Sequence, residues 1–259
     1  MPVAGKTEDP ILPARATHEQ RHSKKRGIMA KAATHPSPPA WSYQQAVVRF
    51  SAPQVASQYP SRFRSDHWRE RREKHCITKA LRSIPPGSHV LDLPCGTGRL
   101  TWLLMDRGFH VTAADVSEAM LATARTNIAA RRPPMEENLP VAVFELQDIM
   151  QTGYADGQFD AIVCNRLFHH FTESDTRLRA LRELRRICRG PVIISFFNSF
   201  ALDAVYRKLR DKVRGRTRQD RIPIPYKIFH AELLAAGFRI HKKIAVRWGV
   251  SPHWYVMAV

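Results

Sequence analysis

Two closely spaced glycines, Gly96 and Gly98, lie between a short apolar run and a stretch with helical character. Glycine allows a backbone to approach a ligand closely, and the N-terminus of the helix that follows offers free N–H groups. Asp115 comes 19 residues after Gly96, at the end of the next apolar run. A carboxylate at that point can accept hydrogen bonds from both ribose hydroxyls of an adenosine ligand. The order of strand, glycine turn, helix, strand and aspartate therefore predicts an adenosine-binding site.

The elements that must position these residues alternate along the chain between short apolar runs and longer stretches with helical periodicity. The strand candidates are 89–93, 110–114, 141–146, 161–164 and 192–197, and the helical candidates are 65–84, 99–107, 117–130, 173–188 and 226–236. Strands that alternate with helices of roughly ten residues or more are typical of βαβ units and a parallel sheet. Two further strand-like runs, 239–246 and 254–259, follow each other without an intervening helix. The pattern therefore predicts an α/β fold that ends in an antiparallel hairpin at the sheet edge.

The segment Val90–Gly98, V-L-D-L-P-C-G-T-G, resembles the first motif of the class I S-adenosylmethionine-dependent methyltransferases, in which Asp92 would be the acidic residue. A dinucleotide-binding loop would carry a third glycine at the position of Thr101. The resemblance covers roughly residues 60–259 and is most specific over 90–171. It implies S-adenosyl-L-methionine as the cofactor. It also implies a Rossmann-like, seven-stranded, mostly parallel sheet with an antiparallel C-terminal strand and helices on both faces.

The resemblance assigns cofactor-binding roles to individual positions. These positions are Asp92, Pro94, Gly96, Gly98, Asp115, Val116, Asp148, Ile149 and Asn165. Asp115 corresponds to the ribose-binding acid, Asp148 to the residue that bonds the adenine amino group, and Asn165 to the position under the methionyl group. Pro94 departs from the family pattern, which usually has a glycine there. Because proline has a φ fixed near about −65° and no N–H, we expect binding to depend on the two glycines of the turn.

The acceptor site of this fold lies beyond the carboxyl ends of the strands, so the residues that follow Asn165 matter for catalysis. Methyl transfer is an in-line displacement for which the protein mainly supplies positioning, and a base only where the acceptor must lose a proton. His169 and His170 can act as such a base, since imidazole titrates near neutrality. We take His169 as the catalytic candidate. The alternative is that the histidine pair only packs and caps a helix.

The same superfamily narrows the class of acceptor. Methylases of exocyclic amines in nucleic acids resemble one another in an N/D-P-P-Y/F tetrad, whereas the tetrad from Asn165 reads N-R-L-F. Cytosine-C5 methylases need a nucleophilic cysteine in a Pro-Cys context, and Cys164 lies within an expected strand. Arg166 and His169 stand where some quinone O-methylating relatives carry acidic residues, so no metal site is implied. We therefore predict methyl transfer to a small-molecule acceptor, at oxygen or carbon.

Positive charge dominates the composition and keeps two other functions open. The chain of 259 residues carries 41 Lys and Arg against 23 Asp and Glu, a formal net charge of +18. Residues 1–87 hold 16 of these basic residues and 6 of the acidic ones. A second basic segment, 206–225, falls where an insertion would roof the acceptor site, and it suits an anionic acceptor, an acidic membrane surface or RNA. Aromatic residues nearby suit an aromatic acceptor, and the arginines of 173–188 are expected to form a solvated face.

The alternatives are therefore an RNA methyltransferase that docks through its basic segments, and a cofactor-binding interaction module without catalysis. Residues 1–45 are predicted to be a disordered basic extension, because they lack hydrophobic periodicity, and 46–259 to be the methyltransferase domain. Met29 is an alternative start to Met1. Four cysteines without a C-x-x-C pair predict neither a disulfide framework nor a zinc site. The sequence contains no run of about 18 apolar residues, so a transmembrane helix is not expected. The cysteine pattern makes the reducing cytosol the expected location, and the sequence does not indicate an oligomeric state.

Overall fold

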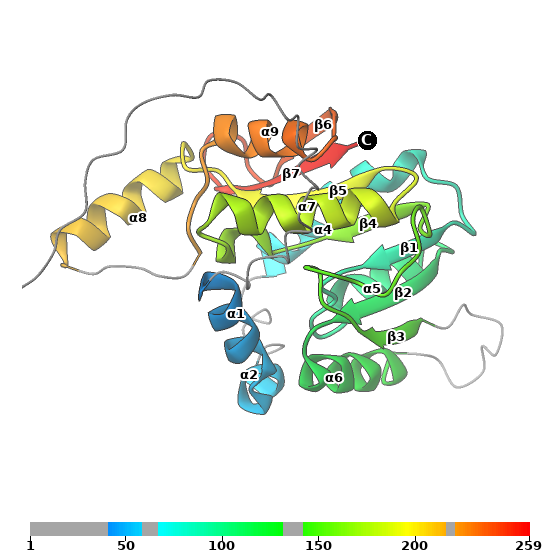
Figure 1. The fold of residues 1–259 in the computed structure, drawn as a ribbon. Coiled ribbons are helices and arrows are strands. Elements are labelled where there is room, and N and C mark those ends of the chain that lie inside the picture. Colours follow the sequence, from blue (N-terminus) through cyan, green and yellow to red (C-terminus); the bar gives the residue numbers. More distant parts are fainter. Residues whose placement is uncertain (1–40, 59–66, 132–141, 216–220) are drawn as a thin grey trace, which may run out of the picture. The chain divides into compact units, whose positions relative to one another are not determined.

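The computed structural model describes residues 41–58, 67–131, 142–215 and 221–259 (Figure 1). Residues 1–40 of the expected extension, including Met29, and residues 216–220 of the basic segment lie outside this part of the chain. Residues 41–45, which we expected to be disordered, begin helix α1 (Trp41–Ser51) instead. They are ordered by tertiary contacts, because Tyr43 is buried in the core and Ser42 donates a hydrogen bond to Glu173.

Seven strands form one sheet in the order β3-β2-β1-β4-β5-β7-β6. The strands are β1 (His89–Asp92), β2 (His110–Asp115), β3 (Val143–Leu146), β4 (Ala161–Cys164), β5 (Val192–Phe197), β6 (Ile240–Ala245) and β7 (His253–Ala258). The first five strands run parallel to one another, and β7 runs antiparallel to both β5 and β6. The predicted mostly parallel sheet with a C-terminal hairpin is therefore confirmed.

Helices lie on both faces of the sheet. Besides α1, the helices of the described residues are α2 (Pro53–Gln58), α4 (His67–Ala80), α5 (Arg99–Met105), α6 (Glu118–Ala129), α7 (Ser174–Ile187), α8 (Leu202–Val213) and α9 (Tyr226–Ala235), with 3₁₀ turns at Leu81–Ser83 and Phe168–His170; α8 extends outward from the sheet (Figure 1). Successive strand residues point to opposite faces. Leu91 and Ile162 thus join the core under α1, α7 and α9, whereas Val90 and Val163 join the core under α4 and α5.

The strand order reverses at β1, which pairs with β2 on one side and with β4 on the other. Chain segments that leave the carboxyl ends of β1 and β4 therefore diverge to opposite sides and open a crevice between them. Ligands of open α/β sheets bind in this crevice. The topology thus places the functional site just after Asp92 and Cys164, the last residues of β1 and β4.

Candidate functional site

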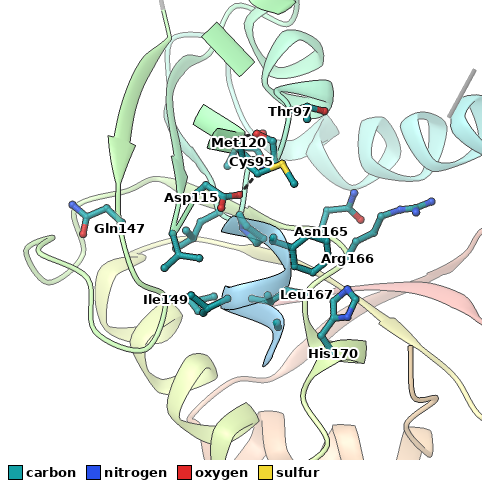
Figure 2. Close-up of a pocket in the computed structure, with 18 of the residues that line it drawn as sticks. Cys95, Thr97, Asp115, Met120, Gln147, Ile149, Asn165, Arg166, Leu167 and His170 are labelled. Carbon is teal, nitrogen blue, oxygen red and sulfur yellow. Dashed lines mark hydrogen bonds between the residues drawn. The ribbon is translucent and has the colours of Figure 1, made fainter. Parts of the chain in front are cut away.

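A pocket of about 930 Å³, open solvent at its mouth included, lies at the carboxyl ends of β1 to β4 (Figure 2). The segments that follow these strands form most of its wall, and α1 closes one side. Seven of the nine expected cofactor positions line it, namely Asp92, Pro94, Gly96, Asp115, Val116, Ile149 and Asn165. Gly98 and Asp148 lie beside the pocket without forming its wall.

The two glycines of the turn after β1 have different structural roles. Gly96 has a φ of 55°, and a Cβ added there would meet nothing within 4 Å, so its backbone borders open space in the pocket. Gly98, at φ 76°, starts helix α5, and a Cβ there would come within 3.2 Å of the Ala124 side chain of α6. Gly96 therefore provides close approach to a ligand, and Gly98 provides close packing of two helices.

Asp115 joins the end of β2 to the glycine turn. One carboxylate oxygen accepts the Gly96 N–H at 2.9 Å, and the other accepts the Ser117 N–H at 3.0 Å. Burial raises the pKa of this carboxyl to about 6, against the backbone N–H groups that lower it. Each oxygen keeps a further acceptor position, so a carboxylate held in this way can also face ligand hydroxyls (Figure 2).

Asp92, at the end of β1, lines the pocket and carries a buried carboxylate. Its Oδ2 accepts the Thr101 hydroxyl at 2.8 Å, whereas its Oδ1 finds no hydrogen-bond partner among the described residues. Burial raises the pKa of this carboxyl to about 7. A buried carboxylate without full compensation costs free energy, and a cationic ligand group would relieve that cost.

Helix α1 covers the opening, and it begins within the segment 1–45 that was predicted to be a disordered extension. Tyr43, Val47 and Phe50 line the pocket at a spacing that puts them on one helix face. The Tyr43 hydroxyl donates to Oδ1 of Asp148, which also accepts the Met150 N–H at 2.7 Å. Asp148 is thus linked to α1 and sits behind the wall. The i, i+4, i+7 spacing of these apolar residues was the signal that could have identified the helix.

The turn after β4 forms the opposite wall. Asn165 accepts the Tyr255 hydroxyl of β7 at 3.0 Å through Oδ1. Arg166 has a φ of 60° and donates its backbone N–H to the Ser195 hydroxyl at 2.6 Å. A non-glycine residue in the left-handed region costs free energy and persists where the surroundings fix it. The strand therefore ends in a constrained turn that points Asn165 and Arg166 toward the pocket (Figure 2).

A buried carboxylate that was not predicted from the sequence lies behind this wall. Glu73 of α4 is 1% exposed and pairs with Arg166, with Arg99 at 3.0 Å and with Nδ1 of His253 at 3.1 Å. Burial alone would raise the pKa of Glu73, but its hydrogen-bonded and charged neighbours hold that pKa well below the usual range. Glu73 precedes the buried Cys76, Ile77 and Ala80 by three, four and seven residues. That helical spacing identifies it as the acid on the buried face.

The two adjacent histidines take different places. His170 lines the pocket, with its ring centroid 5.1 Å from that of Phe50. His169, the catalytic candidate from sequence, is buried and stacked on Phe197 at 4.0 Å, and it is not part of the pocket wall. Burial lowers the pKa of His169 well below its ordinary value. The geometry therefore brings His170, rather than its neighbour, to the ligand side.

Residues that commonly bind metals are dispersed over the described segments. Within them, no three His, Cys, Asp or Glu side chains gather closely enough to hold a metal ion. The four cysteines are buried free thiols. Burial raises the pKa of Cys164, the last residue of β4. A buried thiol of raised pKa is a poor nucleophile.

Comparison with known proteins agrees with this geometry. Residues 90–190 match the family described as "Methyltransferase domain". The chain is 31% identical over 128 residues to YqeM of Bacillus subtilis (strain 168), an alignment that covers 48% of each protein. It is 30% identical over 112 residues to the ubiquinone biosynthesis O-methyltransferase of Pseudomonas aeruginosa (strain UCBPP-PA14), covering 43% of this chain and 45% of that protein. The chain thus spans less than half the length of these relatives.

Solved structures extend the match to the whole sheet. Magnesium protoporphyrin IX methyltransferase from Synechocystis PCC 6803, with bound SAH, superposes with a TM-score of 0.57 at 18% identity, over 84% of this chain and 87% of that chain. A SAM-dependent methyltransferase of Leishmania major gives a TM-score of 0.62 at 14% identity, over 84% and 83% of the two chains. Residues 90–190 therefore match a methyltransferase domain, and the fold built around them is that of solved S-adenosylmethionine-dependent methyltransferases.

Proposed function

We propose that this protein is an S-adenosylmethionine-dependent methyltransferase that acts on a small-molecule acceptor, at oxygen or carbon. The observation that carries the proposal is the pocket in which Asp115 is bonded to the Gly96 turn and Asp92 holds a buried, unsatisfied oxygen. Relatives named for ubiquinone biosynthesis and for magnesium protoporphyrin IX favour a small-molecule acceptor over RNA. The acids of the pocket favour an active enzyme over a binding module without catalysis.

The cofactor supplies a methyl group on a positively charged sulfur. Gly96 lets the backbone come close to it, and Asp115 accepts hydrogen bonds from its ribose. Val116 and Ile149 form apolar walls for its adenine ring, and Asp148 is assigned to the adenine amino group through its position beside Ile149. Each assignment follows from a place on or directly behind the pocket wall.

The methionine end lies between the two inner strands. Asp92 faces its cationic groups with the buried Oδ1, Asn165 lies on the opposite wall, and Pro94 borders the turn between them. Helix α1 covers this end and excludes water from it. Arg99 and Arg166 reach the same side, and Glu73 offsets part of their charge. The pocket thus holds a cation with less repulsion from the two arginines.

An acceptor hydroxyl must lose its proton on methylation. His170 lines the pocket, so we assign the proton-accepting role to it first. His169 stays the second candidate, because its ring is stacked on Phe197 and its burial disfavours protonation. An anionic or aromatic acceptor suits the mixture of arginine and aromatic side chains along this wall.

The domain is proposed to run from α1 to the C-terminus, with 206–225 as a basic segment that follows β5 near the acceptor side. No helix in the described segments is both long and apolar enough to cross a membrane. We propose a cytoplasmic location, to which four free thiols are suited, since the cytosol keeps thiols reduced.

Titration calorimetry with S-adenosylhomocysteine tests the cofactor site. Asp115→Ala removes the acceptor for two ribose hydroxyls, so the Kd should rise by at least about 100-fold. Asp106→Ala, an exposed aspartate at the end of α5, is the matched control and should bind as the native protein does. Transfer of labelled methyl to a metabolite panel then identifies the acceptor. Equal affinity of the two variants would refute the ribose assignment, and absence of binding to the native protein would refute the function.

A further inference from the structure

Helix α8 exposes an apolar face that points away from the protein. Leu202, Val205, Tyr206, Leu209 and Val213 are each between 53% and 80% exposed. At about 3.6 residues per turn, their spacing places them on one stripe of the helix. Ala204 and Asp211 are buried and lie on the opposite side. The apolar stripe of α8 therefore faces solvent, whereas a surface helix of a globular protein turns its apolar stripe toward the core.

The exposed apolar surface continues beyond the start of this helix. Phe200 and Trp248 are 72% and 74% exposed. The turn that carries Trp248 is held against α8, because the Leu202 N–H donates to the Gly249 carbonyl at 2.9 Å and the Asp203 N–H donates to Val250 at 3.1 Å. Aromatic side chains of this kind are enriched where proteins meet the headgroup level of a bilayer.

Basic residues flank the apolar stripe on both sides. Lys208 and Lys212 lie along one border, and the other border carries Arg207, Arg210 and Arg214. Across 202–214, five basic residues stand against Asp203 and Asp211. Lysine and arginine beside an apolar stripe are the composition of helices that lie in the plane of an anionic membrane surface.

The geometry points to α8 as an interfacial helix, and we propose that it docks the protein on the surface of an anionic lipid bilayer. With 12 residues the helix is far too short to cross a membrane, so it would lie flat with its apolar stripe among the lipid chains. A second copy is a poorer occupant, because the basic borders of two such helices would repel one another. RNA is also poorer, since phosphates would leave the apolar stripe in water.

The pocket and helix α8 both lie at the edge of the sheet where the parallel strands have their carboxyl ends. Helix α8 follows the carboxyl end of β5, and the pocket lies at the carboxyl ends of the neighbouring parallel strands. Figure 1 shows α8, in yellow, extending outward beyond the strand ends. Binding to a bilayer through α8 therefore requires no rearrangement of the sheet.

Cosedimentation of the full chain with vesicles tests this inference. Vesicles of phosphatidylcholine with phosphatidylglycerol are compared with vesicles of phosphatidylcholine alone. We expect binding to the anionic vesicles and a partition coefficient lower by about tenfold or more for the double variant Val205→Ser/Leu209→Ser. The matched control Ile228→Ser/Leu234→Ser removes two exposed apolar side chains of α9 instead, and it should bind as the native protein does.

Circular dichroism melting confirms that both double variants are folded. Equal partitioning of the native protein and the α8 variant would overturn the proposal, because the binding would then come from the attraction of basic segments to anionic lipid alone. Failure of the native protein to bind anionic vesicles would overturn it as well. Sedimentation velocity without lipid tests whether the apolar stripe is a dimer interface. If the native protein is a dimer and only the α8 variant is a monomer, the stripe binds a second copy of the chain and the proposal is overturned.

Discussion

Replacing Glu73 by glutamine tests the charge balance behind the acceptor side of the pocket. The change keeps the size of the side chain and removes the negative charge that faces Arg99 and Arg166, whose side chains are only 14% and 20% exposed. Loss of one partner from a buried ion pair costs about 3–5 kcal/mol. Glutamine still accepts one hydrogen bond, so we expect a loss of about 3 kcal/mol in the free energy of unfolding.

Urea unfolding of the full chain, followed by circular dichroism, measures this loss. In a domain of this size about 1 kcal/mol shifts the Tm by roughly 2–4 °C, so the Tm should fall by roughly 6–12 °C. Glu70→Gln is the matched control. Glu70 lies on the same helix and pairs with Lys74 at i, i+4 nearer the surface, where such a pair contributes about 0.3–0.5 kcal/mol.

Two results would refute the reasoning. If the two variants lose equal stability, the burial of Glu73 does not decide the energetics. If Glu73→Gln loses less than about 1 kcal/mol, the arginines are satisfied by water and the carboxylate is not their necessary counter-charge.

Two further predictions follow from the glycine turn and the buried acids. Gly98→Ala should lower the free energy of unfolding by about 2–3 kcal/mol, because the new Cβ combines a positive φ with a 3.2 Å approach to Ala124. The control Gly87→Ala also has a positive φ but meets open space, so it should cost about 1 kcal/mol. Equal urea midpoints for the two variants would contradict this prediction. Burial raises the pKa of Asp92 to about 7 in the folded state, above its ordinary value, so the folded protein binds more protons and stability should fall as pH rises from about 4 to 7. Asp92→Asn should flatten that fall by about 3 kcal/mol, and parallel stability curves would contradict the assignment.

The sheet and the glycine turn were predictable because local sequence alone determines them. Strands were short apolar runs bounded by glycine or proline, and their bounds lie within two residues of those observed. Gly96 and Asp115 could be paired in advance, since parallel neighbouring strands must bring their carboxyl ends together. Their hydrogen bond is the direct consequence of that topology.

Residues whose roles depend on packing between distant segments were not predictable in the same way. The arginines of α7 were expected on a solvated face, yet Arg177 is buried and paired with Glu232, 55 residues away in α9. Tyr43 likewise acquires its role only when α1 meets Asp148. From their composition, both segments were predicted to face solvent. A basic or proline-rich stretch does not show which of its side chains will pair with a residue far away in the sequence.

The charges around the pocket explain why a buried glutamate, Glu73, lies beside Arg99 and Arg166. Asp92 and Asp115 give one side of the pocket a negative potential suited to a sulfonium and an ammonium group. Arg99 and Arg166 on the other side would repel those same groups if their charge were uncompensated. Glu73 places one buried negative charge beside both guanidinium groups and offsets part of their positive charge. The arginines can thus contact an acceptor through hydrogen bonds while the pocket still binds a cation.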